Sequence, residues 1–265
     1  MGCLLVGVLN VTPDSFSDGG QFASAARAVE AGVRMWAEGA DWIDVGGEST
    51  RPKAVPVPEA EEKARVVPVI EGLRSRLPAE VRISIDTYKA GTARAALAAG
   101  ATVVNDVSGG LLDPAILGVA AEAGAAIVLG HLRGAPATMM DAIAFSDVVA
   151  EVGAELGERL SAARTAGCDE IWGDPGIGFG KRIEHNLALL RALPALGARV
   201  GAPLLVGVSR KAFIGQLTGK PAAERQFGTA AAVTAAILGG AAAVRVHDVA
   251  AARDVRAVAE ALVRD

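Results

Sequence analysis

Short runs rich in β-branched residues alternate eight times with longer segments that have the apolar period of a helix. The runs cover residues 3–10, 42–46, 82–86, 102–107, 126–131, 170–174, 203–208 and 242–247. The helical segments cover residues 24–38, 59–76, 89–99, 113–123, 145–166, 184–196, 221–239 and 250–263. A strand that is repeatedly followed by a helix predicts parallel strands joined by right-handed crossovers. Because there are eight such units, the sequence favours an α/β fold of the (β/α)8 TIM-barrel type over an open doubly wound sheet.

The length fits one barrel better than two ordinary domains. The 265 residues divide into eight units of about 33 residues, close to the size of a βαβ repeat. No linker, low-complexity tract or charge run separates two parts. We therefore expect residues 1–265 to form a single domain, with its active site at the carboxyl ends of the strands.

Composition limits the classes of function. Hydrophobic residues make up 51% of the chain, and 26 basic residues against 30 acidic ones give a net charge of −4. Without a basic block the chain is a poor binder of nucleic acid, so an anionic ligand needs a local cluster of cations. Its two cysteines, Cys3 and Cys168, are too few for a disulfide framework and fit reduced thiols.

The longest uncharged stretch contains 19 residues, between Arg225 and Arg245. Alanine dominates it and Gly239-Gly240 interrupts it, so a buried helix that leads into a strand explains it better than a membrane span. The first residues lack the basic region and cleavage site of a signal peptide. These features predict a cytoplasmic protein that does not bind membranes.

Almost every expected strand ends in a polar or charged residue. These residues are Asn10, Asp44, Asp86, Asn105, Asp106, His131, Asp174, Ser209, Arg245 and His247. In a barrel they converge on one rim, which is where active sites lie. The alternative is that Asp, Asn and Ser at these places only cap the following helices. Capping does not require the Arg, Lys and His residues that follow the last two strands.

Three loops on this rim have unusual sequences. The first lid loop (residues 10–20) and the second lid loop (residues 46–52) are rich in turn formers, which fits either mobile lids or plain surface turns. The glycine-rich loop (residues 174–181) matches neither a P-loop nor a dinucleotide fingerprint. Its glycines favour close approach of the backbone to a flat ligand.

Cations gather after the last two strands, where TIM barrels most often bind phosphate. Lys211, Arg245 and His247 therefore form a candidate anion site. The sequence has no His and Cys cluster with zinc spacing, whereas Asn10 together with substrate phosphates would suit Mg²⁺. His131 either lines the pocket floor or packs beneath it.

Seven segments resemble the dihydropteroate synthase family, in the order of that family and over essentially the whole chain. They are residues 10–20, 46–52, 84–89, 105–110, 174–181, 209–211 and 245–248. The resemblance implies condensation of 6-hydroxymethyl-7,8-dihydropterin pyrophosphate with p-aminobenzoate, which releases pyrophosphate with Mg²⁺. The family reaction is SN1-like, so the leaving group departs before the amine attacks and no acid–base pair is required.

The resemblance also implies roles for particular residues. Asp174 would accept the paired N–H donors of the pterin, with Asp86, Asn105 and Lys211 around the rest of the ring. Arg245 and His247 would hold the pyrophosphate, with Asn10 bound to it through Mg²⁺.

The lid loops would supply the remaining contacts by the same resemblance. Asp18 would face the pterin cation, and Arg51 would be drawn to the charged groups. Phe16, Thr50, Pro52 and Phe179 would wall the p-aminobenzoate pocket, for which sulfonamides should compete. The carboxylate of the amine would lie at the start of the helix that begins near Lys211.

The chain departs from the family pattern at three positions. Lys53 stands where glycine is usual, Leu132 replaces a frequent Met, and Ala212 replaces a common Ser or Arg. Lys53 puts the mobility of the second lid loop in question, and Ala212 puts affinity for the amine in question.

Two other functions stay open. A pterin-dependent methyltransferase would share the barrel but would need neither pyrophosphate ligands nor lids. A non-catalytic homologue would keep the pterin pocket without turnover. Family analogy further suggests a homodimer through late helices, with which the Ala-rich 228–244 segment is compatible.

Overall fold

The computed structural model describes residues 2–12 and 20–263 and contains the expected eight-stranded barrel. Its strands are β1 (Leu4–Asn10), β2 (Trp42–Gly46), β3 (Arg82–Asp86), β4 (Val103–Asp106), β5 (Ala126–Gly130), β6 (Ile171–Asp174), β7 (Leu205–Gly207) and β8 (Ala243–Val246). All neighbouring strands pair in parallel, in the order β6-β5-β4-β3-β2-β1-β8-β7. A single bridge between Gly173 and Leu204 joins β6 to β7. The prediction of a TIM barrel is therefore confirmed.

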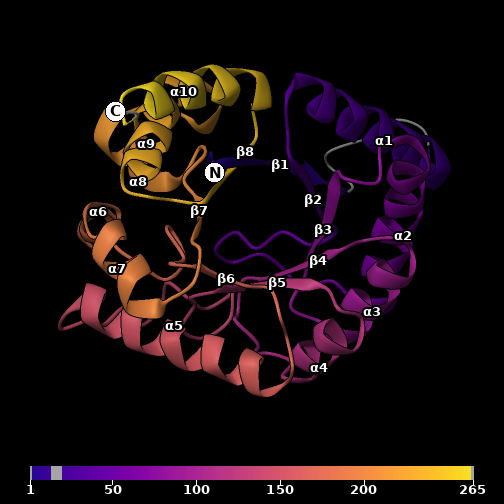
Figure 1. The fold of residues 1–265 in the computed structure, drawn as a ribbon, viewed down its shortest axis with the longest axis horizontal. Coiled ribbons are helices and arrows are strands. Elements are labelled where there is room, and N and C mark those ends of the chain that lie inside the picture. The colour runs from indigo at the N-terminus through magenta and orange to yellow at the C-terminus, as the bar shows by residue number, and fades with distance from the viewer. Residues whose placement is uncertain (1, 13–19, 264–265) are drawn as a thin grey trace.

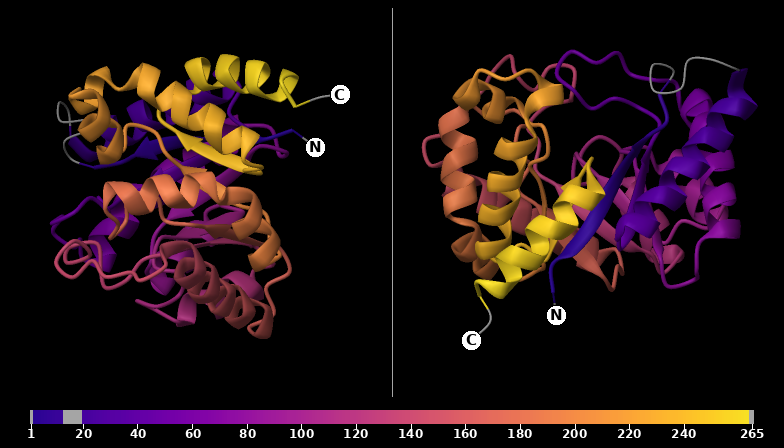
Figure 2. Two further views of the ribbon diagram at one scale, coloured as in Figure 1. Left: turned by 90° about the vertical axis from the view of Figure 1, so that its left-hand side faces the viewer. Right: turned by 90° about the horizontal axis from the view of Figure 1, so that it is seen from above.

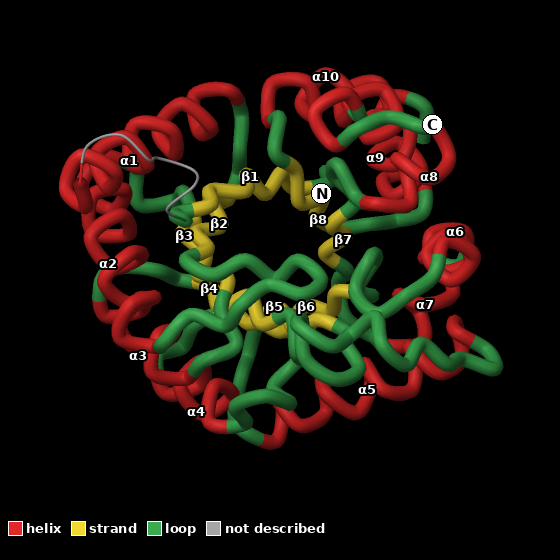
Figure 3. Tube along the Cα trace, turned by 180° about the vertical axis from the view of Figure 1, so that it is seen from behind, coloured by secondary structure: helices red, strands yellow, loops and turns green. Residues whose placement is uncertain are grey.

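Helices surround the strands as an outer ring (Figures 1 and 3). They are α1 (Gly20–Glu38), α2 (Glu59–Arg76), α3 (Ala90–Ala98), α4 (Ala115–Glu122), α5 (Val148–Thr165), α6 (Ile183–Arg191), α7 (Leu193–Val200), α8 (Ala212–Thr218), α9 (Gln226–Leu238) and α10 (Val249–Ala261). Both labelled ends of the chain lie at the end of the barrel opposite the loops that follow the strands (Figure 2). That leaves the carboxyl ends of the strands open to a ligand.

Two expected helices differ from the observed ones. The segment expected at 184–196 divides into α6 and α7 at Ala192, because Pro194 lacks an N–H and starts a new helix. The segment expected at 221–239 begins as a 3₁₀ turn at Ala222–Glu224 and continues as α9. The uncharged stretch is thus a helix followed by a strand, as predicted. No helix in the described part of the chain is long and apolar enough to cross a membrane.

Apolar side chains fill the barrel below its rim. Trp42 and Trp172 meet edge to face with ring centroids 5.1 Å apart. Arg82 lies over the Trp42 ring at 5.4 Å and forms an ion pair of 2.6 Å with Glu170. Each buried ring removes a large apolar area from water, which favours folding by about 1.5–3 kcal/mol per side chain. This layer closes the amino-terminal end of the barrel, so the polar rim at the other end has a rigid floor.

Candidate active site

An ion cluster built from four strands lies inside the mouth of the barrel. Arg245 on β8 donates from Nε to Asp44 Oδ2 at 2.6 Å and from an NH2 to Asp86 Oδ2 at 2.8 Å. Asn105 on β4 donates from Nδ2 to the same Asp44 oxygen at 3.0 Å. The sequence placed Asp44 on the rim but gave it no role, and the structure makes it the shared partner of two predicted site residues.

Burial shapes the electrostatics of this cluster. Burial raises the pKa of Asp86 to about 7, although the charge of Arg245 opposes the rise. Burial alone would lower the pKa of Arg245, but the carboxylates of Asp44 and Asp86 outweigh it and raise that pKa. Asp44 Oδ1 is buried without a hydrogen-bond partner in the described part of the chain. The mouth therefore holds a preformed cluster of hydrogen-bonded ionisable groups.

Asp174 and Lys211 form the opposite wall of the mouth. Asp174 ends β6 and accepts a hydrogen bond of 2.7 Å from the Gly176 N–H. Lys211 follows β7, and its Nζ lies 3.9 Å from the centre of the Phe179 ring. Burial lowers the pKa of Lys211 to about 8, and the negative charge of Asp174 opposes that change. The charges of Asp86 and Arg245 also act on Lys211, so these predicted residues share one site.

His247 lies near Arg245 and Lys211 and takes part in the site as a hydrogen-bonding group. Its Nδ1 is 3.0 Å from the Ser209 hydroxyl oxygen. Burial lowers the pKa of His247 to about 4, and the charges of Arg245, Arg210, Lys211 and Arg51 lower it further. The imidazole is therefore neutral at pH 7. Because the charge of Arg51 acts on His247, Arg51 of the second lid loop lies near the anion site.

The turn that presents Lys211 is strained and well supported. Arg210 has a φ of +59°, a left-handed conformation that is unfavourable for residues other than glycine. Its N–H donates to Thr229 Oγ1 at 3.1 Å, and Arg225 donates to its carbonyl at 2.9 Å. Strain of this kind persists where surrounding contacts hold it, and it clusters at functional sites.

The remaining predicted residues lie around this mouth or outside the described residues. Asn10 ends β1 and is half-buried, Thr50 is half-buried, and Arg51 and Pro52 are exposed. The predictions for Phe16 and Asp18 fall on residues that the structure does not describe.

The buried carboxylate of Glu48 holds the base of the second lid loop. The sequence analysis did not identify Glu48 as a site residue. Glu48 Oε2 accepts from Lys89 Nζ at 2.5 Å and from the Val57 N–H at 2.8 Å, and Glu48 Oε1 accepts from the Tyr88 hydroxyl. Lys89 also pairs with the buried Glu62 at 2.7 Å. A charged residue directly after a strand-end Gly-Gly was the available signal.

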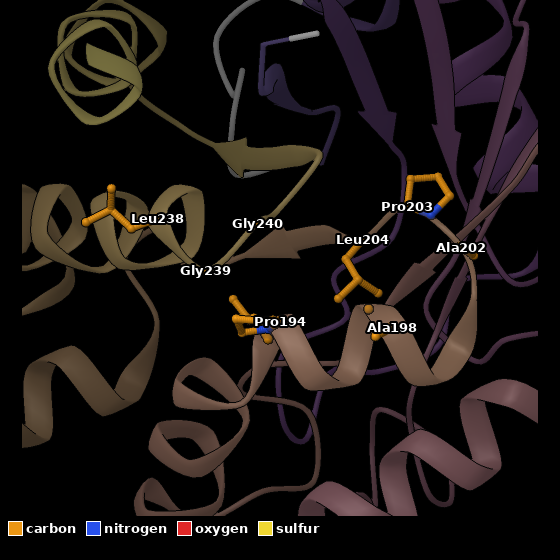
Figure 4. A pocket seen from close by; sticks show the side chains of 10 residues that line it. Pro194, Ala198, Ala202, Pro203, Leu204, Leu238, Gly239 and Gly240 are labelled. Carbon is orange, nitrogen blue, oxygen red and sulfur yellow. The ribbon is translucent and has the colours of Figure 1, made fainter. Parts of the chain in front are cut away.

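A cavity of about 380 Å³ lies between α7 and the end of α9, at the amino-terminal side of β7 and β8 (Figure 4). Its walls are Leu, Pro, Ala and Gly residues, among them Pro194, Leu204 and Leu238. None of these side chains is titratable, so this cavity supplies no chemistry to the mouth.

Known pterin-binding proteins are similar to this chain over most of its length. The family model described as "Pterin binding enzyme" matches residues 6–247. A dihydropteroate synthase from Synechocystis is 48% identical, and the match covers 98% of this chain and 90% of the relative. The dihydropteroate synthase of Xanthomonas albilineans with 4-aminobenzoic acid superposes with a TM-score of 0.91 at 45% identity, covering 98% of this chain and 93% of that one. The Yersinia pestis dihydropteroate synthase in a sulfonamide drug complex gives a TM-score of 0.91 at 39% identity, with coverage of 98% and 94%. The resemblance seen in the seven segments is confirmed, and this chain belongs to the dihydropteroate synthase family of pterin-binding enzymes.

Proposed function

We propose that this chain condenses 6-hydroxymethyl-7,8-dihydropterin pyrophosphate with p-aminobenzoate to give 7,8-dihydropteroate and pyrophosphate. The observation that carries the proposal is the meeting of Asp86, Asn105, Asp174 and Lys211 at one mouth, in a member of this family. A pterin offers paired N–H donors on one edge and a carbonyl nearby. A carboxylate and an ammonium on the same wall match that pattern.

We assign the pterin ring to the wall formed by Asp174 and Lys211. The Asp174 carboxylate accepts the paired N–H donors, and Lys211 donates to the carbonyl and N5 side of the ring. Asn105 has its Nδ2 turned to Asp44, which fixes the orientation of its amide toward the ring. Leaving such partners unpaired costs about 1–3 kcal/mol per buried group, which gives the pocket its specificity.

We assign the pyrophosphate to the side of Arg245 and His247. Arg245 commits Nε and one NH2 hydrogen to the carboxylates, which leaves its other donors for an anion. The charges of Arg210, Lys211 and Arg51 reach the same place. Together they stabilise the negative charge that grows on pyrophosphate as the C–O bond breaks.

The residues on this side also fit Mg²⁺. Asn10 ends β1 and is half-buried at the mouth. One amide oxygen with substrate oxygens and waters is a coordination that Mg²⁺ favours. The ion would neutralise charge on the leaving pyrophosphate. Asn10→Ala should raise the Mg²⁺ concentration needed for half-maximal pyrophosphate release, and an unchanged requirement would contradict the assignment.

The amine enters from the side of the second lid loop and Phe179. After pyrophosphate departs, the pterin cation needs only a neutral aromatic amine, so no side chain must remove a proton before attack. Thr50, Pro52 and Phe179 would wall this pocket and Arg51 would close its charged side. The family resemblance assigns Phe16 to the same wall and Asp18 to the cation, and both fall outside the described residues. The sulfonamide drug complex of the Yersinia relative supports competition at the same place. The helix α8 begins directly after Lys211, at Ala212, so its first N–H groups would be available to the carboxylate of the amine.

We further propose a cytoplasmic homodimer that works in folate biosynthesis. Phe227 and Leu238 are 84% and 45% exposed, and their spacing of eleven residues places both on one face of α9. Leu217 on α8 is also exposed. Phe227→Glu should shift the protein from dimer to monomer in light scattering, and a wild-type monomer would contradict this part.

The deciding experiment measures pyrophosphate release from dihydropterin pyrophosphate and Mg²⁺, with and without p-aminobenzoate. We expect release that rises with the amine, together with dihydropteroate as product. Asp174→Asn should abolish pterin binding in calorimetry, while Asp169→Asn, an exposed control, should leave it unchanged. Pterin binding without release would favour the non-catalytic homologue, and absence of pterin binding would overturn the proposal.

A further inference from the structure

Lys181 ends the glycine-rich loop with an ammonium group that is almost entirely enclosed. The residue is only 3% exposed. Its Nζ lies 3.0 Å from the Gly176 carbonyl, 3.1 Å from the Phe179 carbonyl and 3.2 Å from the His131 carbonyl. The fourth neighbour is His131 Nδ1 at 3.0 Å. Burial of a charge costs much free energy unless acceptors surround it, and here four acceptors from two loops do so.

His131 connects this ammonium to a carboxylate on α5. Burial and the charges of Lys181, Arg159 and Arg133 lower the pKa of His131 to about 2, so the imidazole is neutral. Because Nδ1 accepts from the ammonium, the ring proton lies on Nε2. That nitrogen is 3.0 Å from Glu155 Oε2 and donates to it. The sequence left open whether His131 lines the pocket floor or packs beneath it. The structure shows His131 packed beneath the glycine-rich loop.

The carbonyls held by Lys181 belong to the backbone that presents two assigned binding residues. Gly176 donates its N–H to Asp174, and Phe179 carries the ring beneath Lys211. Gly176 has a φ of +68°, and a Cβ there would come within 2.0 Å of the His131 carbonyl oxygen. The loop is therefore pressed against the end of β5, and only glycine fits at the point of contact.

We propose that Lys181 is a positioning residue, whose buried ammonium fastens the glycine-rich loop to the end of β5 and so holds Asp174 and Phe179 ready for pterin and amine. The inference rests on the proposed function, because it gives Lys181 a task in that same site.

The charge of Lys181 has a second effect on Asp174. Burial raises the pKa of Asp174, and the Gly176 hydrogen bond with the charges of Lys211, Lys181 and Arg245 opposes the rise. Burial lowers the pKa of Lys181 itself, and the negative charge of Asp174 opposes this change and favours the ammonium form. Removing the ammonium thus frees Gly176 and also weakens the ionised form of Asp174, which binds the pterin.

The test compares Lys181→Met with Lys220→Met, a matched change at an exposed lysine. Calorimetry gives the Kd of the pterin pyrophosphate, and steady-state kinetics give the KM of p-aminobenzoate. We expect K181M to raise both this Kd and this KM by about tenfold or more, because roughly one charge-assisted hydrogen bond is lost. K220M should match the wild type. A folded K181M protein with wild-type Kd and KM would overturn the inference.

A second variant keeps the inference testable if K181M does not fold. Glu155→Gln changes a carboxylate that is 30% exposed, at the outer end of the chain of hydrogen bonds. We expect faster amide hydrogen exchange in residues 175–180 and a smaller rise in pterin Kd, about threefold. Faster exchange confined to α5, with unchanged affinity, would count against it. A wild-type protein that neither binds pterin nor releases pyrophosphate would instead show that the proposed function fails.

Discussion

At the scale of single residues, Lys53 carries backbone strain directly after the second lid loop. Its φ is +64°, the left-handed conformation that the usual family glycine tolerates. That conformation costs other residues about 1–2 kcal/mol, while glycine costs about 0.5–1 kcal/mol more in chain entropy. We expect Lys53→Gly to raise the free energy of unfolding by about 0.5–1 kcal/mol in urea denaturation. Lys220→Gly, at a position without positive φ, should lower it, and equal changes in both variants would contradict the argument.

Asp86 should make pterin affinity depend on pH. Burial raises the pKa of this carboxyl to about 7, against the opposing charge of Arg245. Only the ionised form offers two acceptors to the ring donors, and protonation places an O–H against them. Affinity should therefore fall as pH drops below about 7, by up to tenfold per pH unit.

Calorimetry from pH 5 to 8 measures this dependence of the pterin Kd. The Asp86→Asn variant has no proton to gain at this position, so its affinity should be weaker but nearly flat with pH. The same slope in both proteins would assign the dependence to another group.

At the scale of elements, the parallel strands explain why the sequence predicted the rim and not the tasks on it. Carboxyl ends of parallel strands must converge, so Asp86, Asn105 and Asp174 could be grouped from their positions alone. A one-residue step reverses the face of a side chain. Asp44 faces Arg245, whereas the buried Asp106 accepts from the Ser108 N–H at 2.7 Å and only closes its own turn. Asp44 therefore belongs to the ion cluster, whereas Asp106 neither joins the cluster nor caps α4, which begins at Ala115, and the residue type does not distinguish the two.

The burial of Glu48 and Lys181 depends on partners distant in sequence, which no local pattern contains. Glu48 meets Lys89, 41 residues later, and Lys181 meets His131, 50 residues earlier. Loop sequences rich in Gly and charge predict exposed turns. Only the folded barrel brings these two charged residues next to their partners, so their burial could not be predicted from the sequence.

The second lid loop gives a prediction of its own. Glu48 joins the start of this loop to Lys89, Tyr88 and the Val57 N–H, so it fixes the loop at its base. We expect Glu48→Ala to raise the KM of p-aminobenzoate by about tenfold, because the loop that carries Thr50 and Arg51 loses its anchor. Pterin Kd should change little, since Asp174 and Lys211 lie on other elements.

Glu59→Ala supplies the control for that variant. Glu59 is an exposed glutamate at the start of α2 whose partner is Lys63 on the same helix. Its KM should equal that of the wild type. If Glu48→Ala raised pterin Kd and amine KM together, the base of the loop would be a general support rather than an anchor for the amine side.

At the scale of the whole molecule, the barrel has one weak seam, between β6 and β7. A single bridge between Gly173 and Leu204 joins these two strands, and the strand expected at 203–208 is regular only over Leu205–Gly207. Pro203 has no N–H, so it cannot donate to a ladder, although its carbonyl accepts from the Gly173 N–H at 3.0 Å. By contrast, β2 and β3 pair over five positions. Closure of the barrel was predictable from eight units, whereas the place of its weakest joint was not.

The seam separates two residues assigned to the pterin ring, since Asp174 ends β6 and Lys211 follows β7. A ring bound to both would tie these strands together, and local opening there becomes rarer when a ligand binds only the closed form. We expect dihydropterin pyrophosphate to slow amide hydrogen exchange at Gly173 and in β7 more than in β2 and β3. The Asp174→Asn protein should show no such local protection. Equal slowing in all strands, or slowing confined to β3 and β4, would place the pterin elsewhere in the mouth and leave the seam independent of the ligand.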